Sequence, residues 1–151
     1  MLTVRFKEKQ LNNLIKESIK KVLKEERSAD IDDKIINLIS YLHNSQKNIR
    51  EIHWNTNEFA LHMVTDETIS HLFGWEDSLA ETFISGRDIE LTINDTKPSS
   101  NEFKTIMNEL CDMCSEIKKE ISDNKDYDNI CAVVDEILEV SNQLLYKNNL
   151  K

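Results

Sequence analysis

The sequence has few glycines and prolines, few cysteines and no long apolar run. Its 151 residues include two glycines and one proline, so few positions favour tight turns. No apolar run approaches the roughly eighteen residues of a membrane span. Residues 1–27 lack the unbroken apolar core of a secretory signal, so we expect none. Three cysteines are an odd number, which argues against a secreted disulfide framework and for a reducing, cytoplasmic location.

Charge is unevenly distributed along the chain. Residues 1–27 carry eight Lys or Arg and four Glu, a net charge of +4, and the remainder carries eleven Lys or Arg and twenty-four Asp or Glu, a net charge of −13. Together they give the formal charge of −9. Because an acidic body repels nucleic acid, direct DNA binding is not expected. The same body could attract cations, with ordinary solvation of surface charge as the alternative explanation.

Apolar residues recur with helical spacing in five segments and never alternate with period two over a useful length, so we predict an all-α fold. A short amphipathic basic helix is expected within residues 1–27. Ser28 to Asp33 is expected to break it and to cap the next helix. Ser99 and Glu102 have the spacing of a capping box. The four further helices are predicted at about 35–52, 61–83, 103–121 and 130–145.

The connections predict how these four helices pack. The turn around Asn55 to Asn57 is short, so the helices on either side are antiparallel neighbours, and the last two helices form a second hairpin. Residues 86–100, the longest non-periodic segment, join the hairpins. We therefore predict a ferritin-like four-helix bundle over residues 28–151. The helix within residues 1–27 is predicted to dock on a protein partner, on the body itself or on a membrane surface.

The helix predicted over 61–83 carries four side chains of the kind that bind metals. At about 100° per residue, Asp66, Asp77 and Glu81 fall within about 100° of His62, and the apolar residues of the same helix centre about 150° away. The set is therefore expected to face out of its own bundle. His62 and Glu81 lie about 28 Å apart along the axis, so no single ion can touch both in one chain.

The set consists of two pairs with i,i+4 spacing, and a two-fold axis would bring them together. If this helix met its own copy in antiparallel orientation, with the axis near residues 71 and 72, the first pair of one copy would face the second pair of the other. Ile69 and Phe73 lie on the same face and would fill the contact. This geometry predicts a homodimer with two equivalent metal sites shared between copies. A solvated acidic face is the alternative.

This pattern resembles the signature of the Dps-like (DNA-protection-during-starvation) proteins of the ferritin superfamily. It reads His53-Trp54, then His62-x3-Asp66, ten residues, and Asp77-x3-Glu81. The resemblance implies an intersubunit di-iron site that oxidises Fe(II) with peroxide or dioxygen. It implies iron storage or protection from oxidative stress, and a closed shell of twelve subunits. The implied metal ligands are His53, His62 and Asp66 from one subunit with Asp77 and Glu81 from the other, and the last four of these form the catalytic set.

The N-terminal segment carries a second resemblance. Its sequence, VRFKEKQLNNLIKESIKKVLKEE, resembles N-terminal segments shared by otherwise unrelated proteins of tailed bacteriophages. This implies a phage-encoded protein in the cytoplasm of a bacterial or infected host cell, or one associated with the virion. The alternative function is therefore a ferritin-like structural or virion-associated protein of a bacteriophage that has no catalytic activity.

The remaining residues of chemical interest are expected to have ordinary structural roles. Cysteines on or beside apolar stripes are typically small buried hydrophobes, tryptophans typically belong to the core, and isolated histidines pack or lie at the surface. This applies to Cys111, Cys114, Cys131, Trp54, Trp75, His43 and His71.

Overall fold

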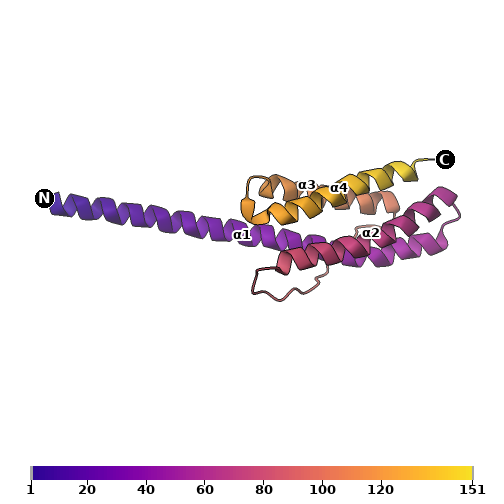
Figure 1. The fold of residues 1–151 in the computed structure, drawn as a ribbon, viewed down its shortest axis with the longest axis horizontal. Helices are drawn as coiled ribbons and strands as arrows, with labels where there is room; N and C mark the ends of the chain where they lie inside the picture. The colour runs from indigo at the N-terminus through magenta and orange to yellow at the C-terminus, as the bar shows by residue number, and fades with distance from the viewer. Residues whose placement is uncertain (1, 151) are drawn as a thin grey trace. The chain divides into compact units, whose positions relative to one another are not determined.

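The computed structural model describes residues 2–150, with side chains from residue 7 onward. No strand occurs among these residues, so the all-α prediction is confirmed (Figure 1). None of the helices in this range has the apolar length that crossing a membrane requires. The elements are α1 (Leu2–Asn55), α2 (Phe59–Ile84), α3 (Phe103–Ile121), a 3₁₀ turn η1 (Lys125–Tyr127) and α4 (Asp128–Asn148).

Residues 34–55 of α1 pack with α2, α3 and α4 as a four-helix bundle. α1 contacts α2 where His43 Nδ1 lies 2.5 Å from Glu76 Oε1. It contacts α3 where the Tyr41 hydroxyl donates to the carbonyl oxygen of Ile106 at 2.9 Å. α4 packs against both α2 and α3. Each helix therefore has two neighbours, and the core lies between all four.

The residue pairings between helices fix their directions. Along α1, His43 and His53 pair with Glu76 and Thr65, so α1 and α2 are antiparallel. Lys34 pairs with Glu120, near the end of α3, whereas Tyr41, which is further along α1, pairs with Ile106, near the start of α3. α1 and α3 are therefore also antiparallel. α2 and α3 consequently run in the same direction. The crossover that joins them, residues 85–102, must travel along the bundle, and the fold is two antiparallel hairpins with one long connection (Figure 1).

The crossover is attached to α1 by a row of polar side chains. Asn44 Nδ2 donates to the carbonyl oxygens of Asn94 at 3.0 Å and Thr96 at 2.8 Å. The backbone N–H of Asn94 donates to the Ser40 hydroxyl at 3.0 Å, and its side-chain amide donates to Asn37 Oδ1 at 2.8 Å. These bonds satisfy backbone groups that have no helix or strand to pair with, so the crossover has a defined path.

α1 does not end where the sequence predicted a break. The helix continues through Ser28 to Asp33, so that prediction is wrong. The stretch contains no Gly or Pro, and Ile31 and Ile35 keep the four-residue spacing of a buried stripe, at 2% and 0% exposure. The chain divides into two compact units, one that ends at Asp33 and one that begins at Lys34.

The predicted capping box at the start of α3 is also wrong. Glu102 is the N-cap residue, and its side chain makes no capping hydrogen bond. The Ser99 hydroxyl and N–H instead donate to Glu109, the latter at 3.1 Å, and the Tyr41 hydroxyl donates to the same carboxylate at 2.8 Å. Burial acts to raise the pKa of Glu109, but the hydrogen bonds from Ser99 and Tyr41 outweigh it and lower the pKa.

Of the residues expected to be structural, most behave as predicted. Trp75 is 3% exposed and Cys114 is buried, but Trp54 is 71% exposed, so its assignment to the core is wrong. Trp54 follows the buried Ile49 by five residues and therefore lies about 140° from it around the helix. Cys111 and Cys131 are half-buried free thiols.

Candidate functional site

The outer face of α2 carries the four candidate ligands of this helix. His62, Asp66, Asp77 and Glu81 are all exposed. The residues that α2 buries lie on its opposite side: Val64, Thr65, Thr68, Leu72, Trp75, Leu79 and Phe83. The four candidate ligands therefore face away from the bundle core, as helical geometry predicts.

His53 and His62 form a stacked pair across the turn between α1 and α2. Their ring centroids lie 4.0 Å apart, with an interplanar angle of 22°. Nδ1 of His53 lies 3.1 Å from the carbonyl oxygen of His62, and Nδ1 of His62 lies 3.2 Å from that of His53. Because a carbonyl oxygen only accepts, Nδ1 is the donor in both contacts, and Nε2 is the ring nitrogen that remains for another partner. Metal-binding histidines typically donate their other ring N–H to such an acceptor.

Thr65 positions this histidine pair, a role that the sequence did not suggest. Its buried hydroxyl lies 3.1 Å from Nδ1 of His53 and donates to the carbonyl oxygens of Leu61 at 2.7 Å and His62 at 3.0 Å. The same oxygen can accept from His53. Threonines within helices commonly donate to a backbone carbonyl oxygen of the preceding turn. Only the contact with His53, on another helix, therefore distinguishes Thr65 from such residues.

The second pair of candidate ligands lies elsewhere on α2. Asp77 borders a hollow of about 420 Å³ that it shares with Phe73 and the crossover residues Leu91 and Ile93. Glu81 borders a different hollow, of about 500 Å³. Among the described residues, no group of three or more His, Cys, Asp or Glu side chains is placed to hold a metal ion. The fold therefore brings His53 and His62 together but does not bring Asp77 and Glu81 to them.

Large apolar side chains alternate with the ligands on this exposed face. Phe59 is 80% exposed, Phe73 65%, Met63 52% and Ile84 39%. Single exposed apolar residues are common, but several on one face of one helix indicate a contact surface. The outer face of α2 thus combines metal-binding residue types with apolar groups that water solvates poorly.

A further histidine–carboxylate contact lies beside this face. Glu76 accepts from Gln46 and lies 2.5 Å from Nδ1 of His43. The antiparallel register through the short turn would have placed these residues together, so the sequence contained a usable signal. His71, on the other side, stacks on Trp75 with centroids 5.1 Å apart, which is the ordinary packing role predicted for it.

Comparison with known proteins identifies the family but no activity. The model of the Family of unknown function (DUF5856) matches residues 53–147, and the chain belongs to this family. The matched region begins at His53 and includes all five candidate ligands. No curated protein and no solved structure matches the chain.

Proposed function

We propose that this member of the family is a ferritin-like protein of the Dps-like type, which binds and oxidises Fe(II) at sites shared between two copies of the chain. The observation that carries the proposal is the His53–His62 pair. Both Nδ1 atoms are engaged by carbonyl oxygens, so both Nε2 atoms are available to a metal at the exposed end of α2. Asp66 lies one helical turn further along the same face.

The spacing along α2 supports a second copy as the source of the missing ligands. In an antiparallel two-fold pairing about the point between residues 71 and 72, positions equally far from that point face each other. His62 then lies opposite Glu81 of the partner subunit, and Asp66 lies opposite the partner's Asp77. Each copy would supply one half of two equivalent sites.

In the same register, two pairs of apolar residues face each other. Phe59 lies opposite the partner's Ile84, and Met63 lies opposite the partner's Ala80. Phe59 and Ile84, both exposed in the single chain, would flank each site at the two ends of the contact. Their burial would exclude water from the ligands, and it gives the pairing a favourable term that does not depend on metal.

Each residue has a role that follows from its chemistry. His53 and His62 supply neutral nitrogen donors, and Asp66 and Asp77 supply carboxylate oxygens, a mixture that suits iron. Glu81, with the longer side chain, would be the carboxylate with the reach to contact a second ion. Two Fe(II) ions each give one electron to a peroxide, whose O–O bond breaks and whose oxygens leave as water after taking up two protons.

Carboxylates from two copies would face one another before iron binds. Like charges held close together repel, so the metal-free contact is weakened by its own ligands and metal relieves that repulsion. Iron binding and association of the two copies should therefore be coupled. The closed shell of twelve that the resemblance implies would be built from such dimers.

The test is an anaerobic Fe(II) titration followed by addition of peroxide, with rapid oxidation recorded optically. One variant carries Asp77→Asn and Glu81→Gln, and the other carries His62→Ala and Asp66→Asn. Each alone should bind iron weakly and lose rapid oxidation. The matched control is Glu67→Gln with His71→Ala, another acid–histidine pair at i,i+4 spacing on α2, which should oxidise iron like the parent.

Mixing the two site variants tests whether the site is shared. A mixed dimer rebuilds one intact site from the unmutated halves, and random exchange should restore about a quarter of parental oxidation. Parental oxidation in either variant alone would refute the proposed site. Absence of oxidation in the parent as well would favour the alternative, a ferritin-like structural or virion-associated protein, for which the exposed apolar residues of the N-terminal segment are the supporting observation.

A further inference from the structure

Residues 9–24 of α1 have an exposed apolar side. It consists of six large aliphatic side chains that are between 47% and 61% exposed: Leu11, Leu14, Ile15, Ile19, Val22 and Leu23. At about 100° per residue they cover an arc of about 180°, from Leu14 to Leu23. This arc is wider than the narrow seam along which the helices of a coiled coil meet. The apolar stripe therefore fits a broad apolar surface better than a single partner helix.

The other half of this helix is cationic. Residues 9–24 contain five lysines and one glutamate, a net charge of +4. All five lysines lie outside the apolar arc, and Lys16 and Lys21 lie about 20° beyond its two edges. Glu8 and Glu26 fall within the arc but lie beyond the two ends of the stripe. A lysine at such an edge can lay its methylene stem along an apolar surface and keep its ammonium group in water.

The composition of this segment is unlike that of a protein interface. Protein contact surfaces are enriched in aromatic residues, Met and Arg and depleted in Lys, and Leu and Val are under-represented among the residues that dominate binding. Residues 9–24 contain no aromatic residue, no Met and no Arg. Aliphatic residues on one side and lysines on the other are typical of helices that lie in the interface of a membrane.

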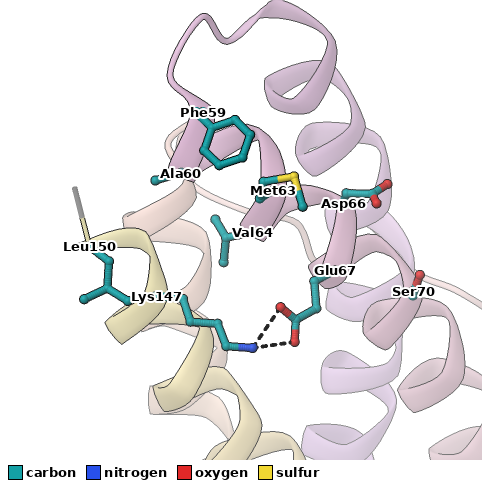
Figure 2. A pocket seen from close by; sticks show the side chains of 9 residues that line it. All are labelled: Phe59, Ala60, Met63, Val64, Asp66, Glu67, Ser70, Lys147 and Leu150. Carbon is teal, nitrogen blue, oxygen red and sulfur yellow. Dashed lines mark hydrogen bonds and ion pairs between the residues drawn. The ribbon is translucent and has the colours of Figure 1, made fainter.

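The hollows of a second copy are poorer partners for the apolar stripe. The hollow of about 400 Å³ between α2 and the end of α4 is lined by Phe59, Met63 and Asp66, on the face that the proposed α2 contact covers (Figure 2). A hollow of about 420 Å³ borders the same face. A third, of about 590 Å³, is lined mostly by polar residues and includes Lys47 and Lys97. Two stripes packed on each other would bring their lysine edges together, and like charges disfavour such a pair.

We propose that residues 9–24 bind the surface of an anionic phospholipid bilayer, with the aliphatic stripe at the boundary between headgroups and acyl chains and the lysines among the phosphates. The segment would extend about 24 Å along that surface. Apolar burial and the attraction of lysines to anionic lipid both favour this contact. It uses none of the proposed metal ligands, and it would hold the acidic body at the membrane.

The test is flotation of the full-length protein with vesicles of phosphatidylcholine alone or of an equal mixture with phosphatidylglycerol. Binding to the mixed vesicles should be at least about tenfold tighter than binding to phosphatidylcholine alone, because each lysine near the surface is attracted by anionic lipid. Added salt should weaken it, because salt screens exposed charges. Absence of binding to the mixed vesicles, or equal binding to both, would overturn the proposal.

Two variants with the same added charge test the apolar side. Ile15→Asp places a carboxylate in the stripe, and Asn13→Asp places one about 160° away, among the lysines. Both positions are exposed, so the helical circular dichroism of both variants should equal that of the parent. Ile15→Asp should weaken binding to the mixed vesicles at least about tenfold more than Asn13→Asp does. Equal effects would overturn the proposal in favour of an attraction that depends on net charge alone.

A second pair of variants tests where the cationic attraction arises. Lys16→Gln with Lys20→Gln should weaken binding to the mixed vesicles at least about tenfold. The matched control is Lys119→Gln with Lys125→Gln, which removes the same charge at exposed positions of the body and should leave binding unchanged. Equal weakening in the two variants would mean that the body makes the contact, and the proposal would be wrong.

Two further measurements separate this inference from the alternatives. Self-association in sedimentation that Ile15→Asp abolishes, without binding to mixed vesicles, would overturn the proposal in favour of contact between chains. Iron oxidation should be the same in the parent, Ile15→Asp and Asn13→Asp. Vesicle binding by a parent chain that does not oxidise iron would refute only the proposed function. Oxidation by a parent chain that does not bind vesicles would refute only the membrane contact.

Discussion

Replacing Tyr41 by phenylalanine tests how the crossover, α1 and α3 are joined. The Tyr41 side chain is buried, with the residue 2% exposed, and its hydroxyl hydrogen lies between two acceptors, the Ile106 carbonyl at 2.9 Å and Glu109 Oε2 at 2.8 Å. The substitution keeps the ring and its packing and removes only the donor. Burial and the bond to Glu109 raise the pKa of Tyr41, so it is a donor throughout the neutral range.

The cost can be estimated from the acceptors that lose their partner. A hydrogen bond to a charged group contributes roughly 1.5–3 kcal/mol. Glu109 is half-buried and keeps its bonds from Ser99, so solvent reduces the contribution of the Tyr41 bond. We expect Tyr41→Phe to lower the free energy of unfolding by about 1–2 kcal/mol near neutral pH. The measurement is urea unfolding followed by circular dichroism. Tyr146→Phe removes a phenol that is 66% exposed and should cost almost nothing.

The pH dependence has a definite sign. The folded pKa of Glu109 lies below its ordinary value of 4.5, so its stabilising effect is present above that value and is lost as pH falls through the folded pKa. Tyr41→Phe removes one of the bonds that lower this pKa, so the difference between parent and variant should shrink in acid. An equal cost in acid and at neutral pH would refute the assignment of the effect to the carboxylate.

Three further predictions concern the core, the crossover and the proposed contact. Leu79→Ala should cost about 2–5 kcal/mol in urea unfolding because Leu79 is fully buried, whereas Ser78→Ala beside it should not; equal effects would contradict the packing. Asn44→Ala removes two bonds to crossover carbonyl oxygens and should hasten proteolysis between residues 85 and 102; an unchanged rate would mean that they do not anchor it. Asp66→Asn should leave metal-free association no weaker in sedimentation, because it removes a repelling charge; weaker association would contradict the proposed register.

The helices and the direction of the α2 face were predictable because they depend on local periodicity. Phe83, Leu79 and Leu72 repeat with helical spacing, so their common side had to be buried, and His62 and Asp77 had to lie on the other side. The short turn after Asn55 was enough to make α1 and α2 antiparallel.

Features that depend on residues from another part of the chain were not predictable in the same way. Ser99 and Glu102 have capping-box spacing, but Ser99 binds Glu109, ten residues away, because the crossover brings that carboxylate within reach. Polar residues between Ser28 and Asp33 suggested a break, yet the buried Ile31 and Ile35 continue the helix. Helix propensity is a weak preference that such tertiary burial readily overrides.

The sequence by itself determined the number of helices in the bundle, their pairing into hairpins and the face on which the candidate ligands lie, because each follows from spacing along one chain. Only the tertiary structure decided that His53 stacks on His62 with both Nδ1 atoms bonded to carbonyl oxygens, that Thr65 supports them, and that Trp54 is exposed while Trp75 is buried. Those features depend on distances between residues of different helices, which the packing of the whole bundle sets and which no local pattern encodes.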